Sequence, residues 1–337
     1  MTREFTFVPL YLEPHQRLGF TRCEVVPGLF VTTVSQPLRR VLDSSKGKVP
    51  ALSFHPTHAV FVDHEKYIRE VRRRIQADGG TPPPTDDPRW PGLPNHLARH
   101  AVISLLLLQR FRFVVAGGSY ALELTRPGVY RWASWGAAPM EQVSLAVICV
   151  LPVLPQATVD PQRLKRIAGL LDRYYRSGVW HMDRLAVALS SFWNGVCTPF
   201  MDQAFVSFTT VLEALLSDGG AEVTQKLAER TARLIGKTST ERLAIYNSVR
   251  HLYDIRSRIA HGRVHEIRGR LDWGVFHIDA KTAVVSVDDM KELGRIVNRV
   301  VLAVLGRPDI MAVIQKRQPE DAATKQLREL FVRETLG

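Results

Sequence analysis

The feature that most constrains the fold of this chain is a change of pattern at Asp160. From there onward, apolar residues recur at helical spacing, and most of the segments between them carry helix start and stop signals. Asp160 and Pro161 are the first start signal, because aspartate caps helix N-termini and proline fits the first helical turn. Residues 160–312 are therefore predicted to form an all-α bundle.

The longest predicted helix in this bundle begins at Thr238 and stops at Gly262. Thr238 and Glu241 have the spacing of a capping box, and glycine commonly ends a helix in the left-handed conformation. The segment "GVFHIDAKTAVVSV", residues 274–287, predicts a small β-hairpin inserted before a further helix capped by Asp288. Prolines divide the remainder, and residues 313–337 are expected to form a helical tail.

Residues 1–155 show a mixed pattern. β-Branched runs within residues 18–34 and 51–63 predict strands, and residues 65–76 and 96–111 have helical spacing. Residues 77–95 contain so many prolines and glycines that a loop is expected. Because 337 residues suffice for about two domains, the chain is predicted to join an α+β domain to a helical bundle.

Bulk properties narrow the classes of function. A formal charge of +12 favours polyanionic partners such as RNA, DNA, nucleotides or anionic lipid. Three widely separated cysteines argue against a disulfide framework and a cysteine zinc site, which fits a reducing cytoplasm. We found no secretory signal and no apolar run long enough to span a bilayer. We therefore expect a cytoplasmic protein without a membrane partner, metal or cofactor.

The segment "LYDIRSRIAHGR", residues 252–263, holds the candidate site. A five-residue step along a helix gives a net rotation of about 140°, so Arg256 and His261 do not share a face. Arg258 and His261, three residues apart, are closer neighbours. Asp254 precedes Arg258 by four residues and is expected to pair with it, which leaves Arg256 as the free cation.

Two segments carry a resemblance to a known family. "RSRIAHG", residues 256–262, resembles the R-x4-H signature of the HEPN superfamily, particularly its Apea-like branch. "FVSFTTVLEALLS", residues 205–217, resembles the other landmark helix of that family and carries Glu213. The resemblance covers about residues 160–312 and does not extend to the N-terminal half.

This resemblance implies a metal-independent endoribonuclease that dimerises so that two copies line one cleft. Arg256 would grip the scissile phosphate and His261 would act as general base or acid, while the RNA 2′-hydroxyl is the nucleophile. Such an enzyme would serve as a toxin or in antiviral defence, meeting a phage or antitoxin partner through its N-terminal domain. The supporting residues are Ser257, Glu213 and Gly262, and the expected RNA contacts are Arg258, Arg263, Arg173 and Arg176.

A noncatalytic module that binds nucleic acid, nucleotides or a partner is the alternative. Arg256 would then pair with Glu213 inside the bundle, and His261 would bond to free carbonyls at the helix end, with Gly262 as the left-handed cap. Arg173 and Arg176, next to aromatic residues, would belong to a solvated helix face. Whether the chain is an enzyme stays open at this point.

Overall fold

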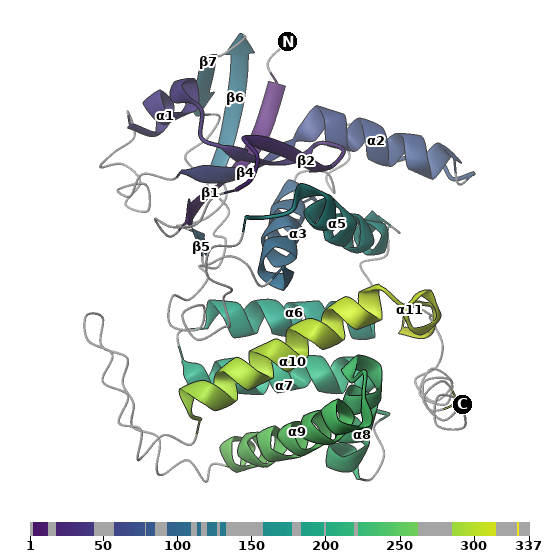
Figure 1. Ribbon diagram of the computed structural model, residues 1–337. Helices are drawn as coiled ribbons and strands as arrows, with labels where there is room; N and C mark the ends of the chain where they lie inside the picture. Colours follow the sequence, from purple (N-terminus) through teal and green to yellow (C-terminus); the bar gives the residue numbers. More distant parts are fainter. Residues whose placement is uncertain are drawn as a thin grey trace. The chain divides into compact units, whose positions relative to one another are not determined.

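The computed structural model describes most of the chain, divided between two compact units. The described residues are 3–12, 18–43, 57–77, 79–84, 93–108, 113–115, 120–126, 129–132, 158–176, 183–198, 200–218, 222–261, 285–314 and 329. The first unit comprises residues 1–143 and 153–179, and the second comprises residues 144–152 and 180–337. An α+β N-terminal region followed by a helical bundle, as the pattern predicted, is therefore the architecture (Figure 1).

The first unit is built on an antiparallel sheet in the order β2-β3-β4-β1-β6-β7, with β5 paired to β1 beside β6. The strands are β1 (Arg3–Leu12), β2 (Arg22–Val26), β3 (Leu29–Thr33), β4 (His58–Asp63), β5 (Phe113–Val115), β6 (Tyr120–Arg126) and β7 (Val129–Trp132). The central strand β1 was not predicted from the sequence. Its consecutive residues Phe7 and Val8 are both fully buried, so both faces of the sheet are covered here and the alternation of a half-exposed strand is lost.

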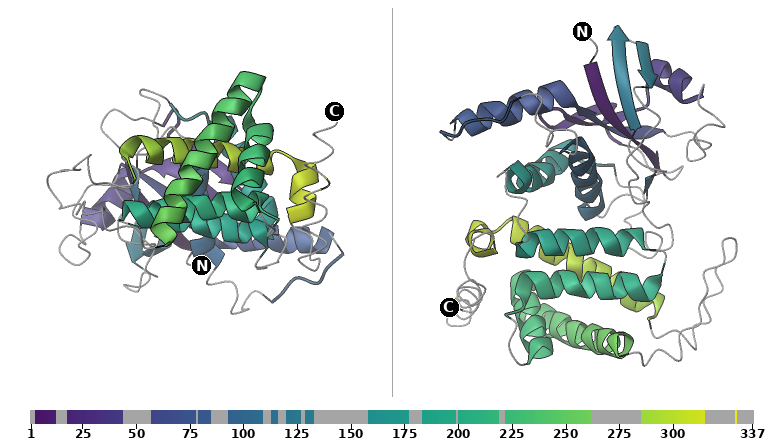
Figure 2. Two further views of the ribbon diagram at one scale, coloured as in Figure 1. Left: turned by 90° about the horizontal axis from the view of Figure 1, so that it is seen from below. Right: turned by 180° about the vertical axis from the view of Figure 1, so that it is seen from behind.

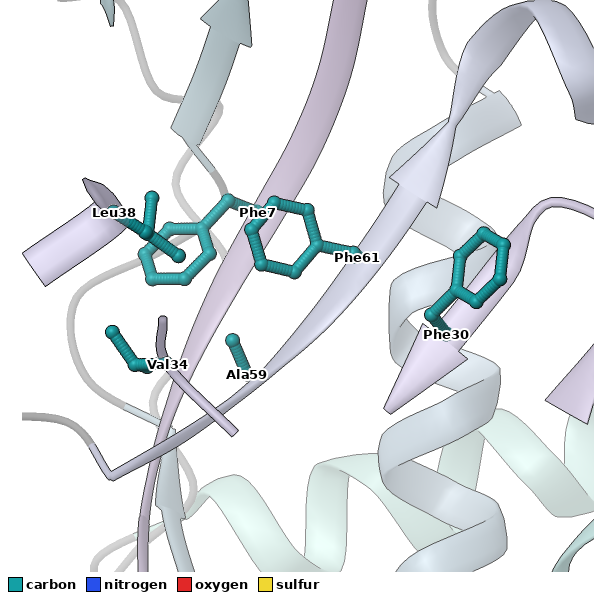
Figure 3. Close-up of a cluster of buried hydrophobic side chains, with 6 residues drawn as sticks. All are labelled: Phe7, Phe30, Val34, Leu38, Ala59 and Phe61. Atoms are coloured by element: carbon teal, nitrogen blue, oxygen red, sulfur yellow. The ribbon is translucent and has the colours of Figure 1, made fainter. Parts of the chain in front are cut away.

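One face of this sheet packs against α1 (Gln36–Asp43). Leu38 of α1 lies beside Phe7, and the rings of Phe7 and Phe61 pack at an interplanar angle of 59° with centroids 5.2 Å apart (Figure 3). Helices α2 (His64–Ala77) and α3 (Leu93–Leu107) also pack on the sheet. Gly28 makes the β2–β3 turn with φ of +84°, and a Cβ there would come within 2.8 Å of the Tyr67 backbone nitrogen of α2.

Helix α5 (Pro161–Arg176) belongs to the first unit, which differs from the domain boundary suggested by the sequence. Its apolar stripe, including Leu164, Ile167 and Leu171, is buried, and the helix packs against β2 and α3. Arg74 of α2 also contacts the buried Asp172 of α5 at 3.4 Å. The boundary between the units therefore follows this helix instead of preceding it.

The second unit is helical and contains α6 (Arg184–Cys197), α7 (Met201–Leu216), α8 (Val223–Ile235), α9 (Ser239–Ala260), α10 (Val287–Leu305) and α11 (Pro308–Ile314). Helices α6 and α7 lie side by side, α8 packs on α9, and α10 crosses α7 (Figures 1 and 2). Gly195 lies inside α6, and a Cβ there would come within 2.8 Å of the Phe208 ring. This glycine permits the close approach of α6 and α7.

The start of α10 differs from the prediction, and two predicted segments lie almost wholly outside the described residues. Ser286, not Asp288, caps α10, and its side chain and that of Asp289 form a reciprocal capping box. The inserted hairpin predicted over residues 274–287 lies almost wholly outside the described residues, as does nearly all of the tail predicted over 313–337.

Candidate functional site

The candidate site lies between α7 and α9. The buried residues of α7, among them Phe205, Phe208 and Leu212, hold this helix in the core. Glu213 follows in the last turn and a half, at the edge of that apolar face, and its side chain is 23% exposed. The same apolar periodicity that buries α7 therefore places one carboxylate at the border between core and solvent.

Helix α9 presents the residues opposite Glu213. The helix begins at the cap Thr238, whose side chain accepts a hydrogen bond from the Glu241 backbone, and Val249, Leu252 and Ile255 anchor it in the core. The directions of Tyr253 and Arg256 follow from this anchoring, because both flank the buried stripe on the same side, three residues apart.

Tyr253 and Arg256 share one oxygen atom of Glu213. The Tyr253 hydroxyl donates to Glu213 Oε1 at 2.5 Å, and Arg256 Nη2 lies 3.4 Å from the same Oε1. The Arg256 guanidinium carbon is also 5.6 Å from the centroid of the Tyr253 ring, within the range of a cation–π contact. The two contacts with Glu213 are unequal, since the tyrosine bond is short and the arginine contact is long.

Arg256 makes one polar contact with the part of the chain that the structure describes. Its Nε is buried and has no hydrogen-bond partner, and Glu213 is the only ion-pair partner that its guanidinium has among the described residues. The side chain is 28% exposed, so part of it can meet a ligand from solvent. A guanidinium carries five N–H donors in a planar fork that matches a phosphate, and this one has a single ion-pair contact with the described residues.

The Tyr253 hydroxyl stays protonated over the ordinary pH range. Burial, followed by the hydrogen bond to Glu213, raises the pKa of Tyr253 to about 12. The hydroxyl therefore acts as a donor toward the Glu213 carboxylate at neutral pH. Tyr253 was not predicted as a site residue, although its position three residues before Arg256 was a usable signal.

His261 lies at the C-terminal end of α9 and is exposed. Its backbone N–H donates to Ser257 and Ile259 carbonyls, whereas its ring makes no hydrogen bond with the described part of the chain. The predicted bond between this ring and free helix-end carbonyls is therefore absent. Within one chain, a regular helix directs the Arg256 and His261 side chains about 140° apart, so the site does not bring them together by itself.

Two expectations about neighbouring arginines are wrong. Asp254 and Arg258 are both exposed, and no ion pair joins these two described side chains. Arg256, expected to be the free cation, contacts Glu213 instead. Gly262 and Arg263 lie outside the described residues, and so do the side chains of Arg173 and Arg176 in α5.

No metal site and no membrane-spanning helix occur in the described residues. No three His, Cys, Asp or Glu residues there lie close enough together to hold a metal ion. None of the described helices is both long and apolar enough to cross a bilayer. No protein-family model, curated protein or solved structure matched the chain in comparisons with known proteins.

Proposed function

We propose that the helical unit is a HEPN-type, metal-independent endoribonuclease. The observation that carries the proposal is that both reactive side chains in "RSRIAHG" are accessible: Arg256 is partly exposed, and His261 is exposed with a ring that bonds to none of the described residues. The resemblance of this segment and of the Glu213 helix to HEPN landmarks, together with the charge of +12, supports the choice of RNA.

The chemistry needs only groups that this chain and RNA supply. His261 takes the proton from a ribose 2′-hydroxyl, whose oxygen attacks the adjacent phosphorus. Arg256 donates to the phosphate oxygens and stabilises the charge that develops on them. The bond to the 5′-oxygen breaks, a proton is returned to that oxygen, and the products carry a 2′,3′-cyclic phosphate and a 5′-hydroxyl.

Homodimerisation is part of this proposal. Because Arg256 and His261 diverge along one helix, an arginine and a histidine acting on one phosphate are better supplied by two copies of α9. A two-fold axis would place two such pairs in one cleft. The wider role proposed, as a toxin or an anti-phage effector whose N-terminal unit meets its trigger, follows from the resemblance alone.

A noncatalytic RNA-binding module is the second candidate. The contact of Arg256 with Glu213 favours it, because an arginine held by a carboxylate and directed away from the histidine can bind a phosphate without cleaving it. This candidate predicts that His261→Ala leaves RNA binding intact.

The test is cleavage of a mixed RNA pool in EDTA, with detection of 2′,3′-cyclic phosphate ends. Arg256→Ala and His261→Ala are each expected to lower the rate by about 100-fold or more. Arg250→Ala is the matched control, because Arg250 is exposed on α9 and lies 5.8 Å from the Tyr246 ring, much as Arg256 lies near Tyr253. Its rate should remain near that of the native protein.

The possible results separate the two candidates. RNA binding that depends on Arg256, without cleavage by the native protein at any concentration, would establish the noncatalytic module. If the protein neither cleaves nor binds RNA at moderate salt, both candidates are refuted. Growth arrest of bacteria that express the native protein, but not His261→Ala, would support the toxin role.

A further inference from the structure

Glu213 is shared unequally by its two donors. A carboxylate beside an arginine ordinarily accepts two parallel N–H bonds of about 2.7–2.9 Å. Here the Arg256 Nη2 contact is 3.4 Å, and the short bond to Oε1 comes from Tyr253 instead. Tyr253 thus competes with Arg256 for the oxygen atom that both side chains contact.

The unsatisfied Nε of Arg256 supports the same interpretation. A side-on two-point pair would direct Nε and one terminal nitrogen at the carboxylate, yet the buried Nε has no partner among the described residues. A buried donor without an acceptor is unfavourable, so closer pairing with Glu213 would satisfy a group that is unsatisfied here. The Tyr253 ring, 5.6 Å from the guanidinium carbon, supplies the second contact on this side chain.

We propose that Tyr253 is a positioning residue that prevents Glu213 from locking Arg256 into a two-point ion pair. The Tyr253 hydroxyl holds Glu213 Oε1, Arg256 keeps a single long contact with that carboxylate, and the exposed part of its guanidinium stays available for an RNA phosphate. The inference rests on the RNA-binding role proposed above for Arg256, but the tether between the three side chains can be tested without RNA.

Tyr253→Phe is the informative variant, because it removes only the hydroxyl. Glu213 is then free to pair closely with Arg256, and both the RNA affinity and the reaction of Arg256 with a dicarbonyl reagent should fall about three- to fivefold. Modification at Arg256 is followed by peptide mass spectrometry in protein without RNA, and affinity is measured separately on single-stranded RNA.

The double variant Tyr253→Phe, Glu213→Gln separates positioning from a loss of packing. Without the carboxylate there is nothing to lock Arg256, so its reactivity and RNA affinity should return at least to the native level. Tyr246→Phe is the matched control. Tyr246 lies on the same helix below Arg250, and no described residue bonds to its hydroxyl, so this change should leave Arg256 unaffected.

The outcomes of the two assays are distinct. Unchanged Arg256 reactivity in Tyr253→Phe, or a loss that Glu213→Gln does not restore, would overturn the positioning role whether or not RNA binds. If Arg256 reactivity falls in Tyr253→Phe and returns in the double variant, but the protein binds no RNA, the positioning role is confirmed and the proposed function is refuted.

Discussion

Two arginines of the helical unit each meet a carboxylate near the end of α7, and they do so in opposite ways. Arg230 of α8 lies 2.8 Å from Asp218, donates to the Leu216 carbonyl, and has a side chain only 8% exposed against 2% for Asp218. Arg256 of α9 lies 3.4 Å from Glu213, and the two side chains are 28% and 23% exposed.

This difference separates an arginine that stabilises the bundle from one that a ligand can reach. Arg230 joins the end of α7 to α8 through a closely paired, buried guanidinium, so a ligand could reach it only by disrupting the bundle. Arg256 has one long ion-pair contact, an Nε without a hydrogen-bond partner among the described residues, and a partly exposed side chain. Burial and donor use therefore distinguish the two roles, although both side chains form an ion pair.

The largest effect expected from this comparison is the loss of stability caused by replacing Arg230. Arg230→Ala leaves the buried Asp218 carboxylate without this cation, and removing one partner of a buried pair costs about 3 kcal/mol in the free energy of unfolding. Urea unfolding monitored by circular dichroism measures this change. A loss below about 1 kcal/mol would show that the Arg230 pair is no more structural than an exposed one.

An intermediate effect is expected at Tyr253 as the pH rises. Its pKa is raised from 10.0 to about 12, so the folded state holds the phenolic proton more tightly than the unfolded state does. The raised pKa therefore adds to the free energy of unfolding below pH 10, and this stabilisation is lost as the pH rises from 10 toward 12. After allowance for the partial exposure of Tyr253, the stabilisation is about 1 kcal/mol.

The unfolding free energies of the native protein and Tyr253→Phe, compared by urea titration from pH 8 to above 10, test this expectation. The difference between the two proteins should shrink over the alkaline part of the range. A difference that does not change with pH would contradict the bond between Tyr253 and Glu213.

The smallest effect is expected from Arg256→Ala. Because the ion pair with Glu213 is long and partly exposed, its removal should change the free energy of unfolding by about 0.5 kcal/mol. The same urea titration at neutral pH measures it. A loss as large as that of Arg230→Ala would assign Arg256 to the structural class and weaken the functional proposal.

The sequence predicted most of the helical unit and part of the site. Start and stop signals such as Thr238 located α9, since they depend on local chemistry that short segments carry. Strand β1 was missed because burial of both faces of the sheet removes the alternation of a half-exposed strand. Helix α5 was assigned to the wrong unit because an apolar stripe shows that a helix is buried without showing which elements bury it. The pairing of Arg256 with Glu213 stayed an alternative because it joins two helices distant in sequence.

The most direct test of the availability of Arg256 is a comparison of its chemical reactivity with that of Arg230 in the native protein. A dicarbonyl reagent should modify Arg256 much faster than Arg230, and single-stranded RNA should protect Arg256 while leaving Arg230 unchanged. Equal reactivity of the two arginines, or an Arg256 that RNA does not protect, would show that Arg256 is not the arginine that binds RNA.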